Sequence, residues 1–308
     1  MTSGIKAHDL AAWELALTEC KDSPGCFGTL EFMSSAKRAD DEFQVHIKNG
    51  TVVPVKHFTF KKWRLFGKRV VQSVPINGLL GNPSPEHVRP ILELLDKLST
   101  NGELYLQISD SWNRLLGPTL LSEGFALREK TQAHRIDLPD KYEDWFKIKG
   151  VQRRAVRKSE KSGLLVKQSG VKGLEDFYYL YKLSHKRWGK EGKTIHELPM
   201  ERFSRFFELA RERYSIYSVH SSEHPLPIAA AIVGVMGKVA TYLYGATDVS
   251  YGHLRPANYL HASIIRDLLE KGVHTYVMGM SNNDRNVERF KEHLGAYPYP
   301  VFVYKNLK

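Results

Sequence analysis

A seven-residue turn, 250–256, has the composition of an anion-binding site. It reads Ser-Tyr-Gly-His-Leu-Arg-Pro, and a helical pattern begins directly after it. Gly252 and Arg255 provide a flexible backbone and a cation, and Pro256 suits the first turn of a helix. Because the first N–H groups of a helix lack partners and its dipole favours anions, the turn predicts a phosphate site. The alternative for Arg255 is a loop arginine in water.

Residues 151–163 form the most charged segment of the chain. On a helix its cations fall in two rows, Arg153 with Arg157, and Arg154 with Lys158 and Lys161. Like charges at this spacing repel one another unless an anion offsets them. The segment therefore predicts a surface that binds an anionic substrate or cofactor, and the alternative is a solvated surface helix.

Two tyrosines occupy the predicted strand 239–244. Tyr242 and Tyr244 are two residues apart, which places both on one face of a regular strand, and we expect that face to border a cleft. A tyrosine hydroxyl there can donate a proton. The alternative is core packing with one buried hydroxyl.

The elements that must position these residues lie between 239 and 304. A strand is followed by an amphipathic helix whose apolar residues share one face: Leu260, Ile264, Ile265, Leu268 and Leu269. A short strand (273–277), a second helix and a final strand (297–304) complete the order. This alternation predicts an α/β fold, more narrowly α+β, with a mixed twisted sheet flanked by helices.

The ordered motifs of this half resemble the GNAT superfamily of acyltransferases, and most of all the FemAB-type aminoacyltransferases and related acetyltransferase-domain proteins. The resemblance rests on the strand with Met278-Gly279, the pair Phe290-Lys291, and Gly295. The basic segment is also similar to a family helix of the form Arg-x-x-Ile-Arg-Lys-x-Glu-Lys-x-Gly, matched here from Arg153 to Gly163.

The resemblance implies roles for particular residues. Lys291 is expected to offset negative charge that develops near the acyl donor, and its alternative is a surface lysine on an amphipathic helix. The expected catalytic set is Lys291, Tyr244 and Tyr242. The expected cofactor-binding set is Arg255, Gly252, Asn258 and Phe290, and the expected substrate-binding set is Arg153, Arg154, Arg157 and Lys158.

Two features depart from the family pattern. The acetyl-CoA turn of typical GNAT enzymes is Gln/Arg-x-x-Gly-x-Gly/Ala, whereas this chain has Tyr251 to Pro256, and proline donates no hydrogen bond. The helical-hairpin arm of cell-wall FemAB enzymes is also absent, since no charged heptad run occurs. These differences argue against ordinary acetyl-CoA binding and against a direct assignment to peptidoglycan bridge synthesis.

The family resemblance implies two tandem GNAT-like domains, and the sequence contains a trace of duplication. Helix, strand, helix, glycine and strand follow one another in both halves, and Gly124 and Gly295, like Tyr105 and Tyr276, are separated by roughly 171 residues. We predict an N-terminal domain at 1–139 and a C-terminal acyltransferase domain at 140–308. The alternative is that α/β proteins often repeat helix and strand without duplication.

The composition of the chain indicates which kinds of molecule it can bind. The net charge of +11 predicts an affinity for anions, among which nucleic acid, a phosphorylated cofactor and a membrane face all qualify. No signal peptide and no apolar run long enough to cross a bilayer is found in the sequence, and the two cysteines, Cys20 and Cys26, predict buried thiols in a reducing compartment. We expect a cytoplasmic protein with possible peripheral membrane contact, and no metal site, since His253 and His261 are poorly spaced for one.

Two functions follow. The first is transfer of an acyl or aminoacyl group to an amine acceptor, such as a cell-envelope precursor, by direct attack. The donor would be acyl-CoA, another acyl thioester or aminoacyl-tRNA, bound as a co-substrate rather than a permanent cofactor. The second is a catalytically silent GNAT-like protein that binds an anionic polymer or nucleic acid through the 153–161 helix.

Overall fold

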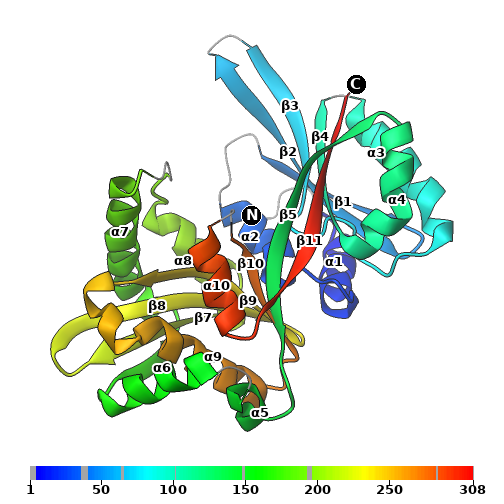
Figure 1. Cartoon of the computed structure of the whole chain (residues 1–308). Coiled ribbons are helices and arrows are strands. Elements are labelled where there is room, and N and C mark those ends of the chain that lie inside the picture. The colour runs from blue at the N-terminus through cyan, green and yellow to red at the C-terminus, as the bar shows by residue number, and fades with distance from the viewer. Residues whose placement is uncertain are drawn as a thin grey trace. The chain divides into compact units, whose positions relative to one another are not determined.

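A computed structural model describes residues 5–35, 41–63, 66–100, 102–147, 150–192, 196–281 and 284–307. By its internal contacts the chain divides into two compact units (Figure 1). Unit 1 comprises Met1–Ala133 and Pro298–Lys308, and unit 2 comprises His134–Tyr297.

Unit 1 is a mixed sheet with helices packed on it. Its helices are α1 (Ala7–Glu19), α2 (Leu30–Ser35), α3 (Val88–Ser99) and α4 (Asp110–Ser122), with short 3₁₀ turns at Gly25–Gly28 and Pro85–His87. Its strands are β1 (Glu42–Lys48), β2 (Thr51–Trp63), β3 (Phe66–Ser73), β4 (Glu103–Ser109), most of β5 (Phe125–Asp137), and β11 (Tyr297–Asn306). Neighbouring strands run antiparallel from β1 to β3, β4 is parallel to β3, and β11 is antiparallel to β4.

The core of unit 1 follows the helical period of α3. Ile91, Leu94, Leu95 and Leu98 repeat at three- and four-residue steps, and all four are buried. They pack against buried β-strand residues such as Leu104 and Leu106 in one cluster. Asn49 and Gly50 form the hairpin turn between β1 and β2, and both have positive φ, as such a tight turn requires.

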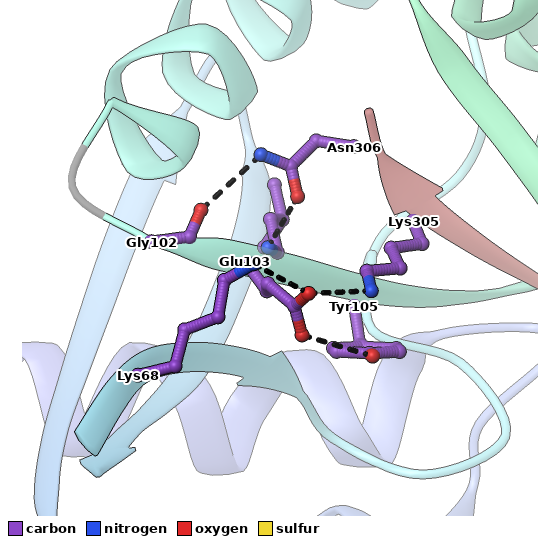
Figure 2. A network of polar contacts seen from close by, with 7 residues as sticks. Lys68, Gly102, Glu103, Tyr105, Lys305 and Asn306 are labelled. Atoms are coloured by element: carbon purple, nitrogen blue, oxygen red, sulfur yellow. Dashed lines mark hydrogen bonds and ion pairs between the residues drawn. The ribbon is translucent and has the colours of Figure 1, made fainter. Parts of the chain in front are cut away.

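A polar network ties the last strand of the chain to β4 (Figure 2). The Glu103 carboxylate accepts hydrogen bonds from Lys305 at 2.6 Å and from Lys68 at 2.8 Å, and Tyr105 donates to its other oxygen at 3.1 Å. The Asn306 side chain accepts from the Leu104 N–H at 2.6 Å and donates to the Gly102 carbonyl oxygen at 3.2 Å. The hydrogen bonds from Lys305 and Lys68 lower the pKa of Glu103 to about 2.

We predict that Glu103→Gln destabilises the protein by about 1–2 kcal/mol at pH 7, after allowance for solvent screening of this partly exposed group. A carboxyl with a depressed pKa stabilises the fold above its ordinary pKa. Its contribution is lost as the pH falls from about 4.5 toward about 2. Urea unfolding at pH 7 and pH 3 measures this. Glu93→Gln, which removes an exposed partner of Arg89, is the matched control and is expected to cost less than about 0.5 kcal/mol. A gap between wild type and Glu103→Gln that stays constant with pH would contradict the prediction.

Unit 2 carries all the residues predicted to do chemistry. Its helices are α5 (Tyr142–Lys147), α6 (Gly150–Lys161), α7 (Leu174–Lys190), α8 (Met200–Leu209), α9 (Pro256–Glu270) and α10 (Arg285–His293), with 3₁₀ turns at Val171–Gly173, Arg211–Arg213 and Val249–Leu254. Its strands are β6 (Leu165–Ser169), β7 (Tyr214–Ser221), β8 (His224–Met236), β9 (Val239–Thr247) and β10 (Thr275–Met280). They lie in the order β10-β9-β8-β7-β6, with β9 and β10 parallel and the others antiparallel.

Helices cover both faces of this sheet. α7 and α8 pack on one face of β7–β9, and α6 and α9 lie on the other (Figure 1). β8 is central and buried on both faces from Ile228 to Val233, a run of small and apolar residues that suits such a place. α9 buries Leu260, Ile264, Ile265 and Leu268 against the sheet, which confirms the periodicity seen in the sequence.

The predicted fold class is confirmed: each unit is a mixed sheet flanked by helices, and the tandem order is visible. α3-β4-α4-β5 and α9-β10-α10-β11 repeat one pattern. Gly124 and Gly295 hold the same place, each in the left-handed conformation just after α4 and α10, with φ of 85° and 92°. β11 nevertheless pairs with β4 of unit 1, while the end of β5 belongs to unit 2. The domain limits 1–139 and 140–308 stay a prediction.

Candidate functional site

Two neighbouring parallel strands, β9 and β10, diverge in the middle of unit 2. β9 and β10 are paired over only three positions, from Val239–Thr275 to Thr241–Val277. β9 continues to Thr247 and β10 to Met280 without further pairing to each other. The backbone groups of β9 and β10 that would face each other beyond this point are therefore not paired between the two strands, and side chains from α9 and α10 lie beside them.

Lys291 reaches the end of β10 from α10. Asp284 caps this helix by accepting hydrogen bonds from the N–H groups of Asn286 and Val287. The Lys291 side chain is buried, and its Nζ donates to the carbonyl oxygens of Gly279 at 3.0 Å and Met280 at 2.9 Å. The alternative of an ordinary surface lysine is therefore wrong.

Burial lowers the pKa of Lys291 to about 8, and the nearby Glu288 carboxylate opposes that fall. An ammonium group has three N–H donors, and two of them are used by β10. Lys291 is thus a fixed cation with one donor left, and it is more easily deprotonated than a lysine in water.

His261 is the residue that sequence reasoning missed. It is 1 % exposed on α9, and its Nδ1 lies 3.2 Å from the Tyr276 hydroxyl of β10. Its ring centroid lies 4.9 Å from that of Tyr242 and 5.5 Å from that of Phe290. Burial, and secondly the charge of Lys291, lowers the pKa of His261 to about 3, so the imidazole is neutral.

The signal for His261 was present in the sequence. It shares the apolar face of α9 with Ile264, Ile265 and Leu268, at steps of three, four and seven residues. Its spacing from His253 is the feature that draws attention in the sequence, and that spacing suits a metal site poorly. In the part of the chain that the structure describes, no group of three or more His, Cys, Asp or Glu side chains is placed to hold a metal ion.

The expectation that Tyr242 and Tyr244 share one face is wrong. Tyr244 pairs with Ile232 and Tyr242 with the next residue, Val233, so Leu243 is an extra residue in β9. Such a β-bulge breaks the alternation of the strand. Tyr242 packs against His261 of α9, whereas the ring of Tyr244 meets Phe203 of α8 on the opposite face, with centroids 5.0 Å apart.

The side chain of Tyr242 folds over β9, its own strand, and reaches Gly245. A Cβ built on Gly245 would stand only 1.8 Å from the Tyr242 hydroxyl oxygen and 2.6 Å from the ring carbon that bears it. Glycine is therefore needed at 245 for this tyrosine to keep its place. Burial raises the pKa of Tyr242 to about 12, so its hydroxyl remains protonated near neutral pH.

The 250–256 turn is more closed than a phosphate loop should be. Residues Val249–Leu254 form a 3₁₀ helix, and Arg255 is left-handed (φ 60°) with its N–H bonded to the Gly252 carbonyl. The N–H groups of Asn258 and Tyr259 both donate to the Arg255 carbonyl oxygen, and Pro256 has none. Of residues 255–259, only Ala257 has an N–H without a partner in the structure. Gly252 and the Arg255 side chain are exposed.

The basic segment, α6, holds this turn in place with its polar inner face. Gln152 donates to the Asn258 carbonyl at 3.1 Å and accepts from the Asn258 amide at 2.7 Å, so the Asn258 side chain is already engaged. The Ser159 hydroxyl lies 2.7 Å from the Leu254 carbonyl oxygen and 3.1 Å from that of Arg255. α6 is therefore more than a solvated helix.

We predict that Ser159→Ala destabilises the protein by about 1–2 kcal/mol, because the partly buried Leu254 carbonyl loses its donor and the Arg255 carbonyl loses one of three. Ser162→Ala is the matched control. The side chain of Ser162, which directly follows α6, bonds only to the Lys158 carbonyl at an exposed position, and we expect a change within about 0.5 kcal/mol. Urea unfolding of both variants measures the difference, and equal values would remove Ser159 from the support of the turn.

The cations of α6 point away from this inner face. Arg154, Arg157 and Lys158 are exposed and Arg153 is half-buried. In the described part of the chain, none of the four makes an ion pair with a carboxylate. Their charge is thus available to an external anion.

Comparison with known proteins finds one matching domain family and several structures of similar fold. Residues 147–292 match the family model described as an acetyltransferase (GNAT) domain. No curated protein sequence matches the chain. The structure of FemX superposes with a TM-score of 0.76 at 13 % identity, covering 96 % of this chain and 95 % of that one.

Two further solved structures extend the comparison. The C-terminal domain of a putative lysylphosphatidylglycerol synthetase from Agrobacterium fabrum gives a TM-score of 0.59 at 14 % identity, covering 97 % of this chain and 92 % of that one. A tandem GNAT protein from the clavulanic acid biosynthesis pathway gives 0.54 at 12 % identity, covering 99 % and 95 %. The protein has a GNAT-superfamily fold. Within that superfamily its tandem, FemAB-like form is the one shared with these structures.

Proposed function

We propose that the protein transfers an acyl or aminoacyl group from an activated donor to an amine acceptor by direct attack. The observation that carries the proposal is the position of Lys291. A buried ammonium with one unused N–H stands at the end of β10, where β9 and β10 separate. That is where charge stabilisation is needed if the donor carbonyl lies between the strand ends.

The reaction needs no covalent enzyme intermediate. The acceptor nitrogen attacks the donor carbonyl carbon, a C–N bond forms, and a tetrahedral oxyanion develops. The remaining N–H of Lys291 is proposed to donate to that oxyanion. The C–S or C–O bond to the leaving group then breaks, and the protonated hydroxyl of Tyr242 is proposed to supply a proton to it. The acceptor enters as the free amine, and its nitrogen is proposed to give up one proton as the amide forms, which restores the Tyr242 hydroxyl. We assign no such part to Tyr244, which faces α8.

The remaining predicted residues keep supporting roles. Phe290 is proposed to form an apolar wall for the donor beside His261. Gly252, Arg255 and Asn258 are proposed to contact the donor near the start of α9, and Arg153, Arg154, Arg157 and Lys158 to attract an anionic substrate. Since only the Ala257 N–H is open between residues 255 and 259, the turn favours a donor that is not held by a pyrophosphate, such as aminoacyl-tRNA, over acetyl-CoA.

The acceptor is proposed to be an amine-bearing cell-envelope precursor. The support is one structural neighbour, which is named for the synthesis of an aminoacylated envelope lipid. No helix in the described part of the chain is long and apolar enough to cross a membrane. Both classes of donor are made in the cytoplasm, so the proposal places the reaction there, with peripheral contact to the membrane where the acceptor requires it.

Thermal unfolding with three donors tests the function. Acetyl-CoA, a long-chain acyl-CoA and aminoacyl-tRNA are compared, and a donor at a hundredfold excess over its Kd should add about 2.7 kcal/mol to the free energy of unfolding. The stabilising donor is then incubated with amine acceptors, and the amide product is measured. The proposal fails if no donor stabilises the protein and no amide forms.

A second function, silent binding of an anionic polymer or nucleic acid, is favoured by one observation. The closed 249–254 turn offers little to a cofactor, while the cations of α6 have no carboxylate partners among the described residues. Stabilisation by RNA or an acidic glycan without amide formation from any donor would support this function instead.

A further inference from the structure

A surface pocket lies on the outer side of α6, away from the strand ends. Its volume is about 750 Å³, and it is lined by residues that precede or belong to α5, α6 and α9. Arg153 and Arg157 enter it from α6 and Arg266 from α9. Lys291, Tyr242 and the 249–254 turn are not among its lining residues. The pocket is therefore distinct from the site proposed for acyl transfer.

The arginines that line the pocket have no carboxylate partner among the described residues. Three carboxylates, Asp140, Glu143 and Glu270, also line it, yet none forms an ion pair with a guanidinium group of the pocket in the described part of the chain. Lys147 is paired with Asp144. The three guanidinium groups thus have no carboxylate partner among the described residues, and the N–H donors in the plane of such a group suit the bidentate binding of phosphate.

Aromatic rings accompany these cations. Tyr142 and Phe146 of α5 line the pocket and stack on each other with centroids 5.6 Å apart and an interplanar angle of 21°. The Arg266 guanidinium lies 4.4 Å from the centre of the Tyr142 ring. Guanidinium groups next to aromatic faces are the combination that binds a phosphate and stacks on a base.

We propose that this pocket, formed by α5, α6 and α9, binds a phosphorylated nucleotide, with Arg153, Arg157 and Arg266 on phosphate and the Tyr142–Phe146 pair against the base. This rests on the part of the proposed function that gives the α6 cations an anionic partner, and not on the transfer chemistry. The nucleotide can be part of an RNA, the 3′-phospho-ADP end of a CoA or a nucleoside diphosphate carrier. All three contain a phosphate group attached to a nucleoside, which are the two parts that the pocket is proposed to bind.

Binding to the full-length chain tests the proposal. A fluorescein-labelled single-stranded RNA, adenosine 3′,5′-bisphosphate and UDP are titrated by anisotropy or calorimetry, with inorganic pyrophosphate as the probe that lacks a base. Arg153→Gln/Arg157→Gln should weaken nucleotide binding by about 10- to 100-fold. Lys167→Gln/Lys172→Gln removes the same charge at two exposed positions of unit 2 that lie outside the pocket and outside the proposed substrate-binding set, and should weaken binding less than about threefold. Inorganic pyrophosphate should bind at least about tenfold more weakly than the best nucleotide.

The results show which kind of nucleotide binds and which findings would contradict the proposal. A preference for the RNA, the bisphosphate or UDP supports the pocket and identifies which source it takes. If RNA is preferred, the pocket double variant should also reduce the salt slope of log Kd by about 1.4. Equal losses in the two double variants, binding of pyrophosphate as tight as of nucleotides, or no binding of any probe would overturn the proposal. Lys291→Met should leave nucleotide binding intact, so failure of transfer and failure of this pocket are distinguishable.

Discussion

Replacing Lys291 by methionine is expected to lower kcat for acyl transfer by about 100- to 1000-fold while KM changes little. Methionine has nearly the same length as lysine and fills the same buried space, but it cannot donate a hydrogen bond. A group that acts only on the oxyanion of the transition state contributes to kcat and not to ground-state binding. Steady-state kinetics with the donor identified by thermal unfolding provides the measurement.

The matched control for this experiment is Lys271→Met. Lys271 follows α9 in the same unit and forms an exposed ion pair with Asp267 at 2.6 Å, so its loss should leave kcat within about twofold. Circular dichroism of both variants shows whether the fold is kept. A Lys291→Met enzyme with wild-type kcat would remove this residue from the reaction.

The pH dependence provides an independent test of the same residue. Because burial lowers the pKa of Lys291 to about 8, the ammonium form is lost as pH rises through that value. If the ammonium is the active form, kcat should fall on the alkaline side near pH 8, and this limb should be missing from the residual activity of Lys291→Met. For stability the sign is the opposite. The folded pKa lies below the ordinary value of 10.5, so burial of Lys291 costs stability at neutral pH, and this cost disappears between about pH 8 and 10.5.

The fold could be predicted because local patterns and topology agree in unit 2. The face of α9, the small-residue strand β8 and the glycine that follows each repeated helix are all set by spacing within the chain. The β9 bulge could not be predicted in the same way. An extra residue at Leu243 is defined by its partner strand, and the tyrosines on either side read as regular alternation in the sequence.

The same distinction applies to the site. Phe290-Lys291 was located by its resemblance to a family motif, but its burial depends on the ends of β10 and α10, which are adjacent only in the folded chain. His261 was visible on the apolar face of α9, yet its contact with Tyr276 lies across two elements. The pocket beside α6 depends on Arg266, which is more than a hundred residues from Arg153, so the charge run alone did not reveal it.

Gly245→Ala is expected to destabilise the protein by about 2–3 kcal/mol, although Gly245 lies in a strand, where alanine is ordinarily preferred. The new methyl group would overlap the hydroxyl and ring of Tyr242, whose atoms lie 1.8–2.8 Å from its position. The ring has little room to yield, because His261 packs against it at 4.9 Å. Urea unfolding measures the loss, and Gly189→Ala in α7, where a Cβ meets nothing within 4 Å, is the control expected to be neutral or stabilising.

A double-mutant cycle identifies the cause. In a Tyr242→Ala background the obstacle is gone, so Gly245→Ala should cost nothing or stabilise the strand by about 0.5–1 kcal/mol. The coupling energy between the two positions should then be about 2–4 kcal/mol, which is far above the value for independent sites. If Gly245→Ala costs the same in both backgrounds, the strain comes from the backbone. In that case Tyr242 is not fixed by this glycine, and its proposed proton donation loses its structural support.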